Sequence, residues 1–493
     1  MPTHTGAGPG SGSARAPGLA PPSDRARSSR RAAAWLVPLL LVVLAGSVRL
    51  YRLDQPARIY FDETYYARDA RDLLRRGVEQ GFVVHPPVGK WLIAAGVAAA
   101  GFEPFGWRVA AALAGTLTVL VTYLAGLRLF RRRGAAALAA LLLAVDGLAF
   151  TMSRIAMLDV FLGLFVVTGF WLLLADRDRA WPGTTAGGDH DAAAPGLSQW
   201  RRPRRWLAGV AFGLALATKW SALLAVGAAI LLVLGGELAR RRAATGRVLP
   251  AVAPVLASVV VTLAVVPSVV YVLSYGAWFA RFPQTYTGRQ LCPDARTCPV
   301  PLAGRFRVWF DEQGDIAVFH RDLEADHPYR APALTWPVLG RPVAYYVESC
   351  DDDDTPEREC VVAPGDIAEI LAIGNPGVWW PALVAYPVLV WLAVGRRDWP
   401  AAALLVFLAC QYLPWLASPR PVLFFYATPL VPFVCLGLAH AAWQARRWRA
   451  LRWAPAVVAA LAVAGFVFWY PLLAGIEISR AAWNLRIWPA SWI

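Results

Sequence analysis

Long apolar runs separated by short blocks of arginine constrain the fold of this chain more than any other feature. Of its 493 residues, 57% are hydrophobic and only 16% are charged, whereas soluble domains carry about a quarter charged residues. A helix of roughly 20 apolar residues crosses a bilayer core, because its backbone groups are all hydrogen-bonded within the span. The sequence therefore predicts an all-α polytopic membrane protein.

The net charge of +15 follows the same pattern. A basic chain can bind nucleic acid, but here the arginines lie between apolar runs, which is the arrangement that sets membrane topology. We therefore expect no nucleic-acid partner. The basic blocks indicate cytoplasmic segments and place the N-terminus in the cytoplasm. They occur at 25–31, 131–133, 201–205, 240–242, 396–397 and 446–452.

An even number of crossings must separate consecutive cytoplasmic blocks. This rule divides the longer apolar runs into hairpins with outer tips at 151–154, 218–221 and 418–421. The run 206–238 is the least regular, since its 33 residues are long for one span and short for two. About eleven transmembrane helices result, with the C-terminus outside and the cell membrane as the location.

This topology divides the chain into four parts, with two large extracytoplasmic loops. The larger loop carries sixteen acidic residues against nine arginines, opposite in sign to the cytoplasmic blocks. The parts are a disordered cytoplasmic tail at 1–31, an N-terminal catalytic transmembrane module at 32–275 that includes the first outer loop 51–106, the large outer loop at 276–378, and a C-terminal four-helix transmembrane region with an external tail at 379–493.

Four cysteines in the large outer loop predict one or two disulfides if that loop faces an oxidising compartment. Connectivity cannot be read from the sequence, although Cys292–Cys298 and Cys350–Cys360 would close the shortest loops. The neighbouring acidic run at 351–354 lacks the glycine and alternating ligands of a calcium loop, so we interpret it as a solvated charge run. No zinc spacing, phosphate-binding loop or dinucleotide fingerprint occurs, and we expect neither a metal nor a nucleotide cofactor.

Asp62 and Glu63 form the only adjacent acid pair in the first outer loop, and aromatic residues flank them. Neighbouring residues on a helix point in different directions, so the two carboxylates are expected to have separate roles. One can take a proton from an acceptor hydroxyl while the other orients the acceptor or pairs with a cation. An ordinary acid pair at a helix start explains the pattern equally well.

The expected outer face also carries fixed cations, most of them at the tips of hairpins. Such charges near the hydrocarbon edge are costly unless they are paired or functional, and each one alone is explained by reaching the interface or pairing with a local acid. Gathered on one face, they predict a phosphate-binding site. They are Lys90, Arg108, Arg154, Lys219 and Arg420, and they include both lysines of the chain.

Asp159 and His85 are supporting candidates, together with Arg420. Asp159 lies in an apolar run near its outer end, where an acid either pairs with a tip cation or has a function. His85 precedes two prolines, which force an extended chain and direct the following helix. A lone histidine more often serves packing or hydrogen bonding than catalysis.

Several short segments, read in order across about 60–435, together resemble one family. They are Phe61-Asp62-Glu63, His85-Pro86-Pro87-Val88-Gly89-Lys90, Arg108 with Gly115 seven residues on, Ser153-Arg154-Ile155-Ala156-Met157-Leu158-Asp159, Gly213-Leu214-Ala215-Leu216-Ala217-Thr218-Lys219-Trp220, and Phe424-Phe425-Tyr426 followed by Pro429 and Pro432. This set resembles the protein O-mannosyltransferases of the membrane-embedded GT-C class. The large outer loop is too short for the β-trefoil domain of eukaryotic members, so the chain resembles the smaller actinobacterial form.

The resemblance implies a GT-C architecture, a polyprenyl-phosphate mannose donor and a Ser or Thr hydroxyl of a translocated protein as acceptor. It implies no metal or other cofactor. By position, Asp62 resembles the catalytic base and Glu63 its partner. Arg108 and Lys219 resemble ligands of the donor phosphate, and Arg154 and Lys90 are further candidates for that role.

Two other functions remain open. A related GT-C enzyme, such as the aminoarabinose transferase of lipid A, would transfer its sugar to a lipid or glycan. A non-enzymatic transporter would need binding groups near the bilayer midplane, usually with broken helices and internal repeats. The polar candidates gather at one face and no convincing repeat is present, which favours a transferase.

Overall fold

The computed structural model describes residues 24–80, 83–180, 199–245, 249–292, 294, 297–323, 327–350 and 362–493. Within these ranges, eight helices are long and apolar enough to span a membrane, and three shorter apolar helices accompany them. The expected helical membrane-protein class is confirmed, while the number of crossings stays a prediction. Residues 1–23 of the expected tail, and the acidic run 351–354, lie outside the described residues.

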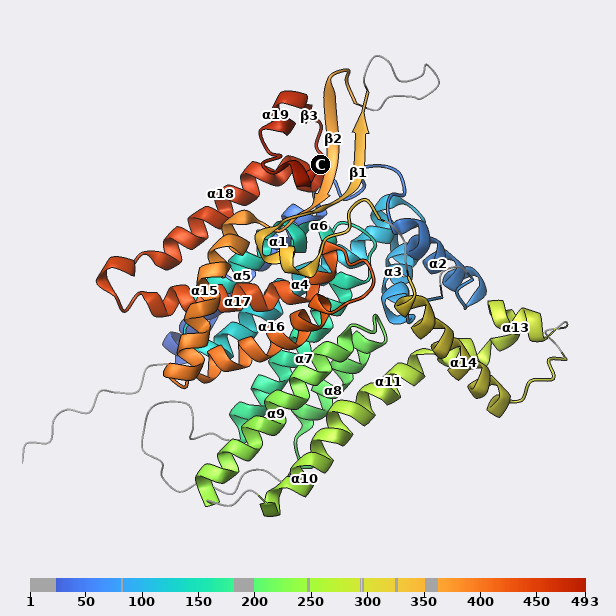
Figure 1. Ribbon diagram of the computed structural model, residues 1–493, viewed down its shortest axis with the longest axis horizontal. Helices are drawn as coiled ribbons and strands as arrows, with labels where there is room; N and C mark the ends of the chain where they lie inside the picture. Colours follow the sequence, from blue (N-terminus) through green and yellow to red (C-terminus); the bar gives the residue numbers. More distant parts are fainter. Residues whose placement is uncertain are drawn as a thin grey trace, which may run out of the picture.

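The N-terminal half is helical, and in Figure 1 its blue to green helices run from the right of the molecule through its centre to the bottom. α1 begins inside the expected tail, since the Arg and Ala residues there favour a helix. The helices are α1 (Asp24–Leu50), α2 (Glu63–Arg76), α3 (Val88–Ala100), α4 (Pro104–Phe130), α5 (Arg133–Ala144), α6 (Gly147–Met152), α7 (Asp159–Ala180), α8 (Pro203–Leu216), α9 (Ala222–Thr245), α10 (Leu249–Val260) and α11 (Val266–Ser274), with a π-helical turn η1 (Val261–Val265) before the last.

The C-terminal half adds the remaining helices and a small sheet. Its helices are α12 (Gly276–Ala280), α13 (Tyr286–Leu291), α14 (Leu302–Arg321), α15 (Pro376–Gly395), α16 (Trp399–Leu416), α17 (Val431–Ala445), α18 (Ala454–Ala474) and α19 (Arg480–Asn484). Short 3₁₀ turns are η2 (Phe282–Gln284), η3 (Ala333–Val338), η4 (Phe424–Leu430), η5 (Arg449–Leu451) and η6 (Ala490–Trp492).

The structure has helix breaks at all three expected hairpin tips. α8 ends at Leu216 and α9 begins at Ala222, so the run 206–238 consists of two helices. The 14-residue α8 is about 21 Å long, short for a span, and it packs between α7 and α11 inside the bundle. This packing explains how a run too short for two full spans still forms a hairpin.

A three-stranded antiparallel sheet was not expected from the sequence. It comprises β1 (Val343–Ser349), β2 (Asp366–Ala372) and β3 (Ile478–Ser479), in the order β1-β2-β3. Figure 1 shows the β1–β2 hairpin standing above the helices, with the C-terminus beside it. Because β3 comes from the C-terminal tail, the sheet ties that tail to the large loop.

One of the disulfides in the large loop is seen directly. Cys292 and Cys298 are bonded to each other, as the short-loop pairing predicts. Cys350 is also disulfide-bonded, and Cys360 lies outside the described residues.

Two helical segments form the centre of the bundle. In the segment 159–180, 72% of the most apolar 18-residue stretch is buried, and in 424–445 the buried fraction of that stretch is 94%. The corresponding fraction for 449–474 is only 28%. α7 packs against α4, α8 and η4. The core therefore fixes the end of α7 that carries Asp159 next to η4, which carries Tyr426.

The opposite end of α7 holds a buried network of charges. Asp176 accepts hydrogen bonds from Arg202 at 3.0 and 2.6 Å and from Arg205 at 3.3 Å. Glu237 accepts from the same two arginines at 2.6 and 3.1 Å. The network joins α7, α8 and α9, because buried charges are tolerated only when they are paired.

We predict that Glu237→Ala destabilises the protein by about 3–5 kcal/mol, since it leaves buried guanidinium groups without their carboxylate. The measurement is the apparent thermal unfolding midpoint of the purified protein in detergent. Asp322→Ala is the matched control, because its partner among the described residues is the exposed Arg321. Equal midpoints for the two variants would show that the network contributes no stability.

Candidate active site

Asp62 lies directly before α2, and its side chain does not cap that helix. The preceding Phe61 has a φ of 50°, a left-handed conformation that is costly for a bulky residue. Its ring packs against those of Tyr345 and Phe425, at centroid distances of 4.4 and 5.9 Å. This aromatic packing holds the unusual backbone and so fixes the direction of the Asp62 carboxylate.

The surroundings make the Asp62 carboxylate more basic than usual. Burial raises its pKa to about 6, Lys219 opposes this shift, and Asp159 adds to it. Within the part of the chain that the structure describes, the carboxylate makes no hydrogen bond. A carboxylate that is ionised at neutral pH, yet basic and unengaged, has the properties that a general base requires.

Lys219 and Asp159 form an ion pair beside Asp62. The Lys219 Nζ lies 2.9 Å from both carboxylate oxygens of Asp159. It also lies 4.8 Å from the ring centroid of Tyr426, which favours a cation at this place. An ammonium group has three protons to donate, so pairing with Asp159 leaves it able to bind a further anion.

Arg420 completes the cationic side of the site. Its Nη1 donates to the Nδ1 and carbonyl of His320 at 3.0 and 3.2 Å, and its Nη2 donates to the Tyr426 hydroxyl at 2.7 Å. Its Nε is buried and has no hydrogen-bond partner among the described residues. The guanidinium therefore keeps one donor that none of these contacts uses.

His85 and His320 stack on each other with ring centroids 5.1 Å apart. Burial and the nearby Lys219 lower the pKa of His85 well below its ordinary value, so its ring is neutral at pH 7. His320 was missed by the sequence analysis because it is a single histidine in a charged segment. Only the fold, which brings the end of α14 to Arg420, reveals it.

We call these converging side chains the Asp62 cluster. Its members come from six separate parts of the chain, and five of them were candidates from the sequence. The cluster consists of Asp62, His85, Asp159, Lys219, His320, Arg420 and Tyr426.

Glu63 has surroundings unlike those of Asp62, as expected for neighbours on a helix. It is fully buried against Arg108, with Nε–Oε1 and Nη2–Oε2 distances of 2.8 and 2.9 Å. The remaining Arg108 protons go to the carbonyls of Leu53, Pro56 and Arg58 at 2.8–3.1 Å. The pair thus ties the loop before α2 to α4.

Arg154 and Lys90 are likewise held by protein partners. The Nη groups of Arg154 donate to the carbonyls of Arg49, Tyr51 and Arg52 at 2.7–2.9 Å, so they cap the end of α1. Lys90 is fully buried and forms ion pairs with Asp69 and Glu79. Of the five expected cations, the structure therefore brings Lys219 and Arg420 into the cluster, while the other three brace the segments around it.

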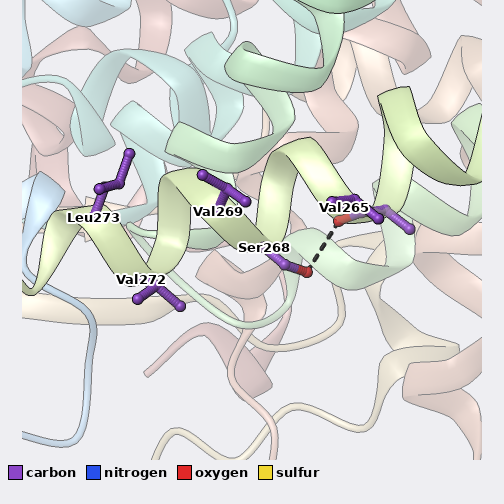
Figure 2. Close-up of a pocket in the computed structure, with 6 residues that line it drawn as sticks. Val265, Ser268, Val269, Val272 and Leu273 are labelled. Carbon is purple, nitrogen blue, oxygen red and sulfur yellow. Dashed lines mark hydrogen bonds between the residues drawn. The ribbon is translucent and has the colours of Figure 1, made fainter. Parts of the chain in front are cut away.

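A separate cavity of about 430 Å³ lies on α11 and contains no titratable side chain (Figure 2). Val265, Val269, Val272 and Leu273 line it, and its one hydroxyl, that of Ser268, donates to the carbonyl of Ala264 at 2.9 Å. Such a surface on an apolar helix is suited to contact with lipid and offers no group for acid–base chemistry.

Two family models match most of the chain. The model described as dolichyl-phosphate-mannose-protein mannosyltransferase matches residues 39–280. The model of the C-terminal four-transmembrane region of protein O-mannosyltransferase matches residues 305–492.

Curated relatives are similar over nearly the whole chain. The polyprenol-phosphate-mannose–protein mannosyltransferase of Mycolicibacterium smegmatis is 34% identical, covering 94% of this chain and 93% of its own length. The protein of the same name from Mycobacterium tuberculosis is also 34% identical, with coverages of 96% and 93%.

Solved structures match the fold at lower identity. The Saccharomyces cerevisiae protein O-mannosyltransferase Pmt1–Pmt2 complex, bound to its sugar donor, matches with a TM-score of 0.74 and 14% identity, over 93% of this chain and 92% of the matched chain. ArnT from Cupriavidus metallidurans, bound to undecaprenyl phosphate, matches with a TM-score of 0.55 and 18% identity, over 89% and 70%. The expected GT-C architecture is confirmed.

We predict that Glu63→Ala loosens the loop before α2, because it leaves the buried Arg108 without a carboxylate at a cost of about 3–5 kcal/mol. Limited trypsin digestion in detergent measures this, since the loop contains cleavage sites after Arg52 and Arg58. Asp62→Asn is the control and should leave the loop as resistant as in the wild type. Unchanged resistance of Glu63→Ala would contradict the bracing role of the pair.

Proposed function

Because the chain belongs to the protein O-mannosyltransferase family, we propose that its Asp62 cluster transfers mannose from polyprenyl-phosphate mannose to Ser or Thr hydroxyls of proteins. Relatives named for this activity are 31–34% identical over 93–96% of the chain, so the protein is a membrane-embedded glycosyltransferase. The observation that carries the site assignment is the unengaged Asp62 carboxylate beside an ion-paired lysine.

Asp62 acts as the general base in this proposal. Its carboxylate takes the proton of the acceptor hydroxyl while the hydroxyl oxygen forms a bond to the anomeric carbon of mannose. The bond from that carbon to the phosphate oxygen breaks, and its electron pair leaves with the polyprenyl phosphate. The donor already carries an activated sugar, so the step requires only a base, positioning and charge stabilisation.

Lys219 and Arg420 stabilise the departing phosphate. Lys219 offers its remaining proton and Arg420 offers its unpartnered Nε, and both lie next to Tyr426. Fixed donors in a buried site stabilise developing charge without having to reorganise. Asp159 orients the ammonium, and His320 orients the guanidinium.

The other candidate residues support a positioning role. All five guanidinium protons of Arg108 go to Glu63 and to loop carbonyls, and those contacts hold the segment that leads to Asp62. Arg154 holds the end of α1, and Lys90 holds α2 against α3. A direct bond from these three cations to the donor phosphate would require some of these contacts to break.

The cluster is proposed to lie on the extracytoplasmic side of the cell membrane, with the N-terminus in the cytoplasm and the C-terminus outside. The arginine blocks support this orientation through the positive-inside rule. The Cys292–Cys298 disulfide in the large loop supports it independently, because disulfides persist in oxidising compartments. Lipid-linked donor and translocated protein would then meet on the same side.

We predict that Asp62→Asn lowers kcat by about 10²–10⁴-fold while donor binding is retained, because it removes the base and keeps the shape of the side chain. Purified protein in lipid is given radiolabelled polyprenyl-phosphate mannose and a Ser/Thr/Pro/Ala-rich peptide. Asp54→Asn, an exposed acid of the same loop, should transfer label as the wild type does.

Label on the peptide that survives in Asp62→Asn would move the base elsewhere. Label that appears in a lipid or glycan fraction, with none on the peptide, would reject proteins as the acceptor class.

We predict that kcat/KM falls as pH decreases through about 6, since the base must be ionised and the pKa of Asp62 is raised to about 6. Lys219 lowers that pKa, so in Lys219→Met the fall of kcat/KM on the acid side should occur at higher pH than in the wild type. Asp159 raises it, so Asp159→Asn should shift this fall to lower pH. The measurement is kcat/KM of the wild type and the two variants across pH 4–8. If kcat/KM falls at the same pH in all three proteins, Lys219 and Asp159 do not influence the base.

A further inference from the structure

β1 is an edge strand whose outer side has no strand partner among the described residues. The sheet order is β1-β2-β3, so β1 pairs on one side only. No hydrogen bond from another described segment reaches the backbone of 343–349, apart from the ladder with β2. Alternate N–H and C=O groups of such a strand point outward and can pair with another extended chain.

Two of the features that natural proteins use to prevent pairing are absent from this edge. The strand reads Val-Ala-Tyr-Tyr-Val-Glu-Ser, with no proline and no lysine. Its one charge, Glu348, is neutralised by Arg58 at 3.1 Å. Val347 is 50% exposed, so solvent reaches the strand near its outer end. An edge strand with unpaired backbone groups can pair with another extended chain, so this edge offers a place for one.

The inner end of the same strand lies beside the proposed base. A bulge between Ala344 and Tyr346 interrupts the register with β2 at Tyr345. The ring of Tyr345 packs 4.4 Å from that of Phe61, the residue before Asp62, and the ring of Tyr346 lies 6.0 Å from that of Tyr60. Bulges are common next to active sites because they redirect a side chain. Figure 1 shows β1 pointing from this end away from the helices.

We propose that the acceptor polypeptide binds as an added β-strand along the free edge of β1, which leads its Ser or Thr hydroxyl to Asp62. This inference rests on the proposed function and deepens it by naming how the acceptor is recognised. Strand addition uses backbone groups, so it accepts many sequences while requiring an extended chain. Seven strand residues cover about 23 Å, enough for about six or seven acceptor residues on one side of the modified hydroxyl.

The proposal has a consequence for acceptor sequence. Only every second residue of an added strand directs its N–H toward the edge, so removing that hydrogen matters at alternate positions. Each lost bond should raise KM about fivefold, with little change in kcat. Proline, which lacks the N–H, should be tolerated at one parity of positions and rejected at the other.

The experiment uses the full-length protein in lipid, polyprenyl-phosphate mannose, and acceptor peptides with a single Ser. One N-methyl alanine is moved through each of the seven positions on either side of that Ser. Alternating KM values on one side of the Ser, and flat values on the other, are the expected result. A proline series through the same positions should alternate with the same phase.

A parent peptide that accepts mannose but shows no alternation on either side would overturn strand addition and leave the proposed function intact. A parent peptide that accepts no mannose, while lipid or glycan does, would overturn the proposed function itself. The two failures are therefore distinguishable in the same series.

Discussion

The ion pair between Lys219 and Asp159 is the contact on which the proposed reaction centre depends. A fixed positive charge near the edge of the hydrocarbon is costly unless it is neutralised, and this lysine has both carboxylate oxygens at 2.9 Å. The pair joins the α8–α9 turn to the start of α7, and the ring of Tyr426 adds η4 to the same point. Three chain segments far apart in sequence are thereby fixed around Asp62. The position of the base relative to the cation follows from this convergence.

The two ends of α7 show how differently a membrane protein can use buried charge. At one end, the guanidinium groups of Arg202 and Arg205 are bound by Asp176 and Glu237, which makes that network a structural joint. At the other end, Arg420 keeps an unpartnered Nε and the Asp62 carboxylate makes no hydrogen bond within the described residues. A buried polar group without a hydrogen-bond partner is unfavourable for stability. Such groups are expected mainly at sites where a bound substrate supplies the missing partner.

Much of the candidate site could be predicted from the sequence, because the positions of apolar runs and arginine blocks predict membrane topology. Arginine blocks located the hairpin tips, and the tips located Asp159, Lys219 and Arg420. The partners of Arg108 and Arg154 could not be predicted, since most are backbone carbonyls, which every residue possesses. His320 and the β1 edge were missed for a related reason: both lie in a charged segment whose fold depends on contacts with the bundle. Sequence patterns thus predict the members of the candidate site better than the contacts that hold them.

The most direct test of the central claim is a structure of the purified protein with polyprenyl-phosphate mannose bound. We predict phosphate oxygens within about 3 Å of Lys219 Nζ and Arg420 Nε, with the anomeric carbon facing Asp62. The Glu63–Arg108 pair and the bonds from Arg154 to the end of α1 should be unchanged. A phosphate held by Arg108 or Arg154, with their present hydrogen bonds broken, would contradict the account and move the donor site away from the Asp62 cluster.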